Sequence, residues 1–208
     1  MRSERIRSPE FLVAPATRND VKEFIESHHY SHSINGVKSS YCFTLTHQGT
    51  LIGAMLFGQM STKGQWEPYG SSEQAVLELR RLVLVDDTPR NCESYFIGKA
   101  LKWLKKNTSV ECVVSYADPA YGHEGVVYKA ANFKFVGVTS PTKVVLLDGK
   151  VYHDRALRTK YKGKYKPFAQ RLRDAVASGE AVLETRPPKN IYVYPLCIPT
   201  NTPTTKEI

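Results

Sequence analysis

The sequence predicts an α/β fold, a mixed central sheet with helices on both faces, followed by a basic C-terminal extension. Apolar runs of strand length alternate along the chain with segments whose apolar residues recur at helical spacing. Residues 75–137 give strand, helix, strand, short helix and strand in direct succession, an order typical of layered α/β proteins. Basic residues dominate after residue 154. We therefore expect a main domain over residues 1–154 and an extension over residues 155–208 that packs on it.

Each element follows from its residue pattern. In the first helix, Val21, Ile25 and His28 fall on one face, and Thr17 or Asn19 precedes it as a cap. Further on, a short polar turn between two apolar runs indicates a hairpin. The predicted order is strand 9–15, helix 21–30, strands 41–48 and 50–59, loop 60–74, strand 75–85, helix 92–107, strand 110–117, helix 125–133, strand 134–139 and hairpin 143–154.

The composition limits the class of protein. The formal net charge is +9 and the sequence pI is about 9.3, so a polyanion, nucleic acid first, is the expected partner. The four cysteines form no Cys-x-x-Cys pair, which argues against a zinc ribbon or disulfide framework and favours a reducing, cytoplasmic setting. The apolar runs are far shorter than the roughly 20 residues of a membrane span, and no signal peptide is expected.

The extension begins with a strongly basic segment. Residues 155–173 carry eight basic residues and no acidic one, with Tyr161, Tyr165 and Phe168 among them. Basic side chains bind phosphate and aromatic rings stack on bases, so we expect a nucleic-acid contact here; a solvated, poorly ordered arm is the alternative. The candidate contacts are Arg155, Arg158, Lys160, Lys162, Lys164 and Lys166. The proline-rich residues 187–208 are predicted to be extended, with the apolar part docked on the main domain.

The start of the helix over 92–107 is a candidate anion site. Free N–H groups and the helix dipole both favour a phosphate at a helix N-terminus. Arg90, Asn91 and Ser94 precede or open this helix, so we expect them to bind the phosphates of a donor molecule. The alternative is ordinary capping of the helix by Asn91.

Two resemblances go beyond these patterns. The run Tyr128–Phe133 followed by Gly137 resembles the last helix and strand of acyl-CoA N-acyltransferases, the GNAT fold. Several segments in the same order also resemble the Mom family of phage DNA-adenine modification proteins, over roughly residues 20–140. These segments are His29-Tyr30-Ser31, Phe57-Gly58, Glu78-Leu79 with Arg81-Leu82, Pro89 through Ser94, Ser115-Tyr116-Ala117-Asp118 and Gly125 through Phe133.

The family resemblance implies a transferase on a GNAT-like fold that acts on N6 of adenine in DNA. Its product is N6-(carbamoylmethyl)adenine, which protects phage DNA from host restriction, so the expected location is the cytoplasm of the infected bacterium. The resemblance also implies double-stranded DNA as a partner. Two other functions stay open: an ordinary N-acetyltransferase on a protein or small amine, and a DNA-binding protein without enzymatic activity. The oligomeric state is open too, a dimer included.

Four residues are candidates for catalysis. Asp118 follows a buried strand, where it can take a proton from the adenine amine or orient it; a turn or cap before Pro119 is the alternative. Tyr128 is the candidate acid for the leaving group, as the acyltransferase resemblance implies, with core packing as its alternative. Glu78 is a candidate base, or the ion-pair partner of Arg80.

Arg80 and Arg81 are adjacent on a strand, so they are predicted to point to opposite faces. A buried arginine needs a partner, such as a carboxylate or a phosphate. Arg80 is the candidate for the face with the catalytic groups, and Arg81 is placed with the residues that bind the donor. The alternation alone does not decide which of the two faces the crevice.

Histidines and aromatic residues are candidates for binding the target base. An adenine must leave the duplex stack to be modified, and an aromatic ring can hold it. The candidate residues are His29, Tyr30, Trp66 and Tyr116. His28 and His32 would share a face if one helix carried both, a spacing that suits a transition metal, although no further ligand is fixed by the sequence.

The donor stays open between two possibilities. Acetyl-CoA supplies an acyl group but not the extra nitrogen of the family's product. An activated glycine such as glycyl-tRNA supplies both, because N6-glycyladenine and N6-(carbamoylmethyl)adenine are isomers; this would make tRNA a second partner. The loop before residue 92 lacks the glycine-rich character usual in acyl-CoA enzymes, which argues against an ordinary CoA pyrophosphate site.

Overall fold

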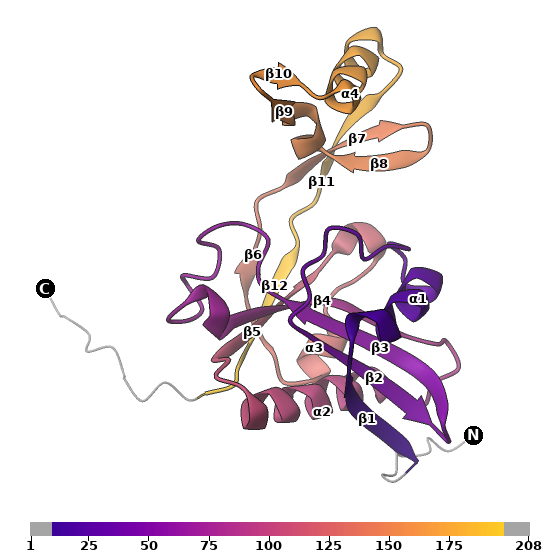
Figure 1. Cartoon of the computed structure of the whole chain (residues 1–208), viewed down its shortest axis with the longest axis vertical. Helices are drawn as coiled ribbons and strands as arrows, with labels where there is room; N and C mark the ends of the chain where they lie inside the picture. The colour runs from indigo at the N-terminus through magenta and orange to yellow at the C-terminus, as the bar shows by residue number, and fades with distance from the viewer. Residues whose placement is uncertain (1–9, 198–208) are drawn as a thin grey trace, which may run out of the picture. The chain divides into compact units, whose positions relative to one another are not determined.

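The computed structural model describes residues 10–197, which form two compact units (Figure 1). The core unit holds the described residues up to Tyr116, then Gly125–Val136 and those from Ile191 onward. The insert unit holds Ala117–Glu124 and Gly137–Asn190. The division predicted at residue 154 falls inside the insert unit, because the hairpin before it and the basic segment after it fold together.

The core unit is built on a seven-stranded mixed sheet. The strand order is β1-β2-β3-β4-β5-β12-β6, antiparallel from β1 to β4 and parallel between β4 and β5. The strands are β1 (Phe11–Ala16), β2 (Tyr41–His47), β3 (Thr50–Gly58), β4 (Val76–Leu84), β5 (Cys112–Ala117), β6 (Lys134–Val138) and β12 (Asn190–Pro195). The predicted mixed α/β architecture is confirmed.

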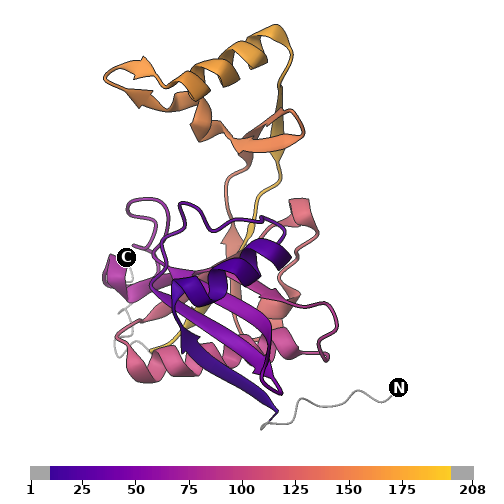
Figure 2. The same cartoon turned by 45° about the vertical axis from the view of Figure 1, so that its right-hand side comes forward.

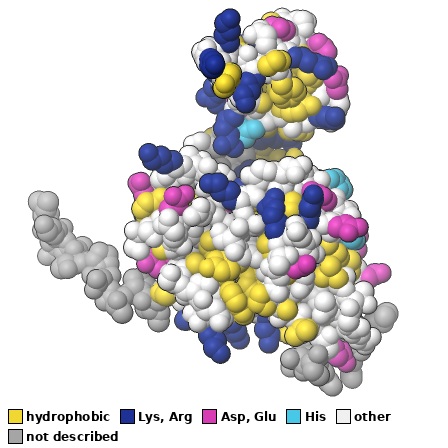
Figure 3. Space-filling view, in the orientation of Figure 1, with side chains coloured by type: hydrophobic (Ala, Val, Ile, Leu, Met, Phe, Trp, Pro, Cys, Tyr) yellow, Lys and Arg dark blue, Asp and Glu magenta, His cyan; other side chains and the backbone are white. Residues whose placement is uncertain are grey.

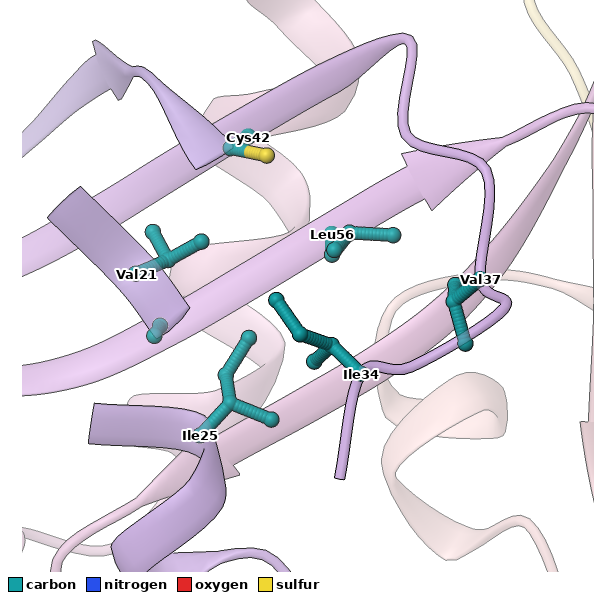
Figure 4. Packing of buried hydrophobic residues seen from close by; sticks show 7 residues of the cluster. Val21, Ile25, Ile34, Val37, Cys42 and Leu56 are labelled. Carbon is teal, nitrogen blue, oxygen red and sulfur yellow. The ribbon is translucent and has the colours of Figure 1, made fainter. Parts of the chain in front are cut away.

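Helices cover both faces of this sheet. The helices are α1 (Arg18–His28), α2 (Cys92–Asn107) and α3 (Val126–Ala130). A capping box between Thr17 and Asp20 starts α1, whose Val21 and Ile25 pack on Leu56 and neighbouring apolar residues (Figure 4). The neighbouring strand residues point to the other face of the sheet, which α2 covers. There the Phe43 ring meets the Trp103 ring of α2 edge to face, with 5.4 Å between the ring centroids.

The last strand of the sheet comes from the C-terminal part of the chain. After β6 the chain forms most of the insert unit and then returns as β12, which lies between β5 and β6. Tyr192 is fully buried, so the apolar segment docks within the sheet. Residues 198–208 of the predicted extended segment lie outside the described residues.

The insert unit has its own sheet and core (Figure 2). Its antiparallel sheet has the order β11-β7-β8, and α4 packs on it through Leu172 and Ala175 against Val145 and Leu147. The basic segment is therefore folded, and the alternative of a poorly ordered arm is wrong. The elements of this unit are β7 (Thr142–Leu147), β8 (Lys150–His153), β9 (Lys160–Tyr161), β10 (Lys164–Tyr165), α4 (Pro167–Ser178) and β11 (Val182–Arg186), with short 3-10 turns at Pro119–Tyr121 and Asp154–Arg158. A further 3-10 turn, Glu73–Ala75, lies in the core unit.

Among residues 10–197, no helix is long and apolar enough to cross a membrane.

A substitution at Gly125 tests the close packing between the start of α3 and Tyr192 in the core unit. Gly125 caps α3 with φ 79°, and a Cβ there would meet the Tyr192 ring. We expect Gly125→Ala to lower the free energy of unfolding by about 3 kcal/mol, the sum of left-handed strain and overpacking. Gly122→Ala is the matched control: its φ is 73° but its Cβ would meet nothing within 4 Å, so about 1 kcal/mol is expected. Urea unfolding measures both, and equal losses would contradict the packing argument.

Candidate functional site

The site is built where β4 and β5 separate. Their parallel pairing covers Val76 to Glu78 opposite Cys112 to Val114, although β4 continues to Leu84 and β5 to Ala117. On its other edge, β4 has a bulge against β3, since Leu56 pairs with Arg81 and Phe57 with Leu79. Arg80 is the extra residue in that bulge, and bulges turn side chains away from regular alternation.

This bulge removes the regular alternation on which the sequence prediction for the two arginines rested. Opposite faces for Arg80 and Arg81 require an unbroken strand, and the register shift lies at this point. Glu78 and Arg80 both influence the pKa of Arg81 electrostatically, so the three charged groups belong to one cluster.

Glu78 and Arg80 form an ion pair within this cluster. Arg80 Nη1 lies 3.2 Å from Glu78 Oε2, and both side chains are largely buried. Arg80 also donates to the Gln59 carbonyl at 2.9 Å and to Ser61 Oγ at 2.8 Å. The ion pair that the sequence allowed as an alternative to a base role is therefore present. Arg80 is held in one orientation by three acceptors from two segments of the chain.

Arg81 carries positive charge without a carboxylate partner among the described residues. It donates to the carbonyls of Arg80 at 2.7 Å and Ser33 at 3.4 Å. Burial lowers its pKa, and the Nε atoms of both arginines are buried without a hydrogen-bond partner. Two guanidiniums and one carboxylate leave the cluster with an excess positive charge. Such a charge is costly to bury unless an anion or a polarised oxygen meets it.

Two tyrosine hydroxyls belong to the same cluster. Burial raises the pKa of Tyr116, with Glu78 adding to the effect, and the Gln65 amide donates to its hydroxyl at 2.7 Å. Burial likewise raises the pKa of Tyr128, which is hydrogen-bonded to Ser115. Both phenols therefore keep their protons at neutral pH and can donate them. Gln65 and Ser115 were not predicted as site residues.

His29 and Tyr30 are adjacent to this cluster. The pKa values of both Arg81 and Tyr128 respond to Tyr30, whose ring packs on His29 with 4.2 Å between centroids. Tyr30 is 49% exposed and His29 is buried, where its Nδ1 accepts the Ser31 N–H at 3.1 Å. An exposed aromatic ring on a buried, fixed imidazole is a suitable surface for a flat base.

Trp66 packs within the core unit. Its ring lies against a buried apolar cluster that includes Val76 and Cys112, and Tyr116 packs against the same cluster. Trp66 therefore helps to fix the loop that supplies Gln65.

The N-terminus of α2 offers free backbone donors. Asn91 occupies the N-cap position with φ 69°, but its side chain makes no cap hydrogen bond, so the alternative of ordinary capping by this side chain is not met. Ser94 Oγ donates to the Asn91 carbonyl at 3.0 Å. Arg90 is exposed beside it. These features fit a phosphate. Glu93 in the first turn opposes an anion, and the loop before the helix is not glycine-rich.

The metal prediction assumed that one helix carries both His28 and His32, and this assumption is wrong. α1 ends at His28, and His32 lies beyond it with φ 44°. His28 Nδ1 bonds the Phe24 carbonyl and His32 Nδ1 bonds the Glu26 carbonyl, so the two rings are held by different backbone groups. Among residues 10–197, no group of three or more His, Cys, Asp or Glu side chains is placed to hold a metal.

Asp118 belongs to the insert unit, directly after β5. Its Oδ1 accepts the Ala120 N–H at 3.1 Å, so the capping geometry foreseen as an alternative is present. Its Oδ2 lies 2.7 Å from Lys189 Nζ, a partner that the sequence did not suggest. The carboxylate is buried and held from both sides.

The six basic candidates for nucleic-acid binding all lie in the insert unit and all are exposed. Residues 137–190 carry twelve Lys and Arg against five Asp and Glu, an excess of seven out of the chain's net +9. Figure 3 shows Lys and Arg side chains gathered on the visible face of this unit.

The strand order, the bulged β4 and its separation from β5 define a GNAT-type fold. A GNAT family N-acetyltransferase from Escherichia coli, solved with CoA, superposes with a TM-score of 0.50 and 11% identity over 93% of this chain and 86% of its own. A spermidine N-acetyltransferase from Vibrio cholerae, solved with CoA and spermine, gives 0.48 and 10% over 90% and 96%.

The sequence comparison assigns the family. The Mom protein family model matches residues 10–205, so the chain belongs to the Mom family. The methylcarbamoylase Mom of Escherichia phage Mu is 36% identical over 137 residues, which cover 64% of this chain and 56% of the phage Mu protein. The match thus spans just over half the length of that relative.

The buried phenols predict a loss of stability at alkaline pH. Burial raises the pKa values of Tyr69, Tyr116 and Tyr128, so above pH ~10 the folded state holds protons that the unfolded state has released. The free energy of unfolding should therefore fall as pH rises from about 10. Absorbance titration at 295 nm should show Tyr69, Tyr116 and Tyr128 ionising late, together with unfolding.

Two variants check which phenols cause this loss. Tyr128→Phe should reduce the alkaline loss of stability, whereas Tyr161→Phe, which alters an exposed ring, should leave it unchanged. A common titration of all tyrosines before unfolding would contradict the burial argument.

Proposed function

We propose that this protein transfers an acyl or aminoacyl group to N6 of adenine in DNA, leading to N6-(carbamoylmethyl)adenine. The observation that carries the proposal is Mom family membership together with the arginine–tyrosine cluster between β4 and β5. The relative from phage Mu is named a methylcarbamoylase. The modification would protect phage DNA in the cytoplasm of the infected host.

The cluster supplies what this transfer needs. The N6 amine is a weak nucleophile because its lone pair is delocalised into the ring. Its attack on a carbonyl requires removal of a proton, stabilisation of the negative oxygen and protonation of the leaving group. Arg81, positive and without a carboxylate partner, is suited to the developing oxyanion. Tyr128, whose raised pKa keeps it protonated, is suited to protonate the leaving thiolate or alkoxide.

The remaining groups orient the reactants. Glu78 fixes Arg80, and Arg80 in turn presents its carbonyl to Arg81. From its position in the sequence, directly after β5, Asp118 is proposed as the acceptor of the amine proton. Its bonds to Ala120 and Lys189 hold the carboxylate in place.

The proposed pocket for the base is made of aromatic and amide groups. Tyr30 stacked on His29 provides the surface for the adenine ring, and Tyr116 with its Gln65 partner provides hydrogen-bonding groups. Trp66 supports this pocket from the core rather than offering a free face.

The donor remains a choice between acetyl-CoA and an activated glycine such as glycyl-tRNA. CoA bound to the GNAT neighbours favours a thioester, and the uncapped N-terminus of α2 beside Arg90 suits its phosphates. The absence of a glycine-rich loop and the basic surface favour the aminoacyl donor. With glycine, transfer gives N6-glycyladenine, whose amine then attacks C6 and displaces the amide nitrogen, forming the isomeric product without a further reactant.

The donor is tested with purified protein and plasmid DNA. Glycyl-tRNA alone should yield a deoxyadenosine heavier by a carbamoylmethyl group if the aminoacyl route holds. Acetyl-CoA alone would give N6-acetyladenine or nothing. Product from acetyl-CoA plus a nitrogen source, and none from glycyl-tRNA, would overturn the aminoacyl route.

The proposed function itself is tested by mass spectrometry of nucleosides from DNA of bacteria that express the full chain. We expect the modified deoxyadenosine with the natural protein, and a loss of about 100-fold or more with Tyr128→Phe and Asp118→Asn. Tyr95→Phe and Asp148→Asn are the matched controls, because each removes a hydrogen-bonded group outside the cluster, and both should remain active. Unmodified DNA with folded natural protein would contradict the proposal.

A further inference from the structure

A small hairpin projects from the basic segment of the insert unit. β9 and β10 pair through two residues each, and the turn between them holds Lys162 with φ 47° and Gly163 with φ 78°. Two consecutive positive φ values are typical of the tight type I′ hairpin turn. The Lys166 N–H closes the hairpin on the Thr159 carbonyl at 3.0 Å. A ribbon this short is not stable alone, so other contacts must hold it.

One face of the hairpin is docked on α4. Lys160 and Tyr165 are cross-strand partners and therefore share a face. Lys160 Nζ lies 4.6 Å from the centre of the Tyr165 ring, and Arg173 Cζ of α4 lies 4.3 Å from it. These cation–π contacts explain the position of Tyr165 and fix the hairpin to the helix.

The other face has no comparable role in folding. It carries the second cross-strand pair, Tyr161 and Lys164, and the Tyr161 side chain is 66% exposed. The contact recorded for its ring is Lys162 Nζ at 5.5 Å, from the turn. No ion pair in the described part of the chain includes Lys162, Lys164 or Lys166. The hairpin thus holds an exposed aromatic ring among unpaired cations on a fixed support.

Lysines beside an exposed aromatic ring match the chemistry of nucleic acid. Ammonium groups bind phosphates without reading sequence, and a tyrosine ring stacks on any base. An acidic protein would pair with the lysines but would give no reason for a tyrosine exposed at the tip. A duplex whose adenine must leave the stack gives that reason, because an inserted side chain offsets part of the lost stacking.

We propose that this hairpin face binds duplex DNA, with Lys162 and Lys164 on phosphates and the Tyr161 ring inserted into the base stack. The inference rests on the proposed function for the identity of the nucleic acid. In this proposal the β9–β10 hairpin is a separate DNA-binding element. Its binding and insertion do not require the acyl or aminoacyl donor.

The test uses the full chain and duplex oligonucleotides that carry 2-aminopurine at successive positions. The natural protein should raise 2-aminopurine fluorescence at one or two positions. Tyr161→Ala should abolish that rise and weaken binding about 5- to 100-fold, while Tyr161→Trp should retain it. Lys162→Ala and Lys164→Ala should each reduce the slope of log affinity against log salt by about 1, with the fluorescence of the bound duplex unchanged.

Lys150→Ala is the matched control, because it removes an exposed lysine from another hairpin of the same unit. It should leave the fluorescence and the binding unaffected or change them far less. Thermal unfolding should be similar for all these variants, since the altered side chains are exposed.

Several outcomes overturn the inference. If Tyr161→Ala and the natural protein gave equal affinity and equal 2-aminopurine fluorescence, the proposed insertion of the Tyr161 ring would be contradicted. Preference for an RNA hairpin over duplex DNA in competition would assign the face to RNA. Normal adenine modification by Tyr161→Ala with unaltered DNA binding would refute this inference and leave the proposed function standing. Insertion without any modified adenine in cells would refute the proposed function instead.

Discussion

The short parallel ladder between β4 and β5 is the constraint on which the candidate site depends. The pairing of β4 with β5 extends as far as Glu78 and joins the two halves of the sheet. Beyond Glu78 the backbones of the two strands no longer pair with each other. Ser115 Oγ reaches the Leu79 carbonyl at 3.4 Å at the point where the ladder has ended. A longer ladder would fill the region with backbone hydrogen bonds, and the arginine and tyrosine side chains would lose their common space.

The charge balance of the cluster indicates that stability alone did not shape it. A structural ion pair needs one arginine for Glu78, and Arg80 meets that need. Arg81 adds a second, partly buried cation whose hydrogen-bond acceptors are the backbone carbonyls of Arg80 and Ser33. Desolvation makes such a group destabilising, so its presence next to protonated tyrosines is best explained by a ligand that brings negative charge during reaction.

Local patterns predicted the core unit well because its strands and helices carry strong periodicity. The helix over 92–107 was predicted with the bounds that α2 has. The bulge at Arg80 was missed, since it depends on the register with β3, which a single strand does not reveal. Helix α4 was also missed, because basic residues masked the apolar spacing of Ala169, Leu172 and Ala175 between Pro167 and Gly179. The sequence foresaw the Glu78–Arg80 ion pair as an alternative, but the hydrogen bonds from Gln65 to Tyr116 and between Ser115 and Tyr128 required the structure.

The position of the insert unit in the chain separates two tasks. Most of this unit lies in the chain between β6 and β12, neighbouring strands of the core sheet, so the core sheet can form whatever this insertion contains. The insert unit has its own apolar core around Leu172 and Val145, so its surface is free to be basic without weakening the core sheet. Under the proposed function, the chain both deforms a DNA duplex and shields a reacting group from water, and this division serves both tasks. Exposed cations suit the first task, and the second needs buried ones.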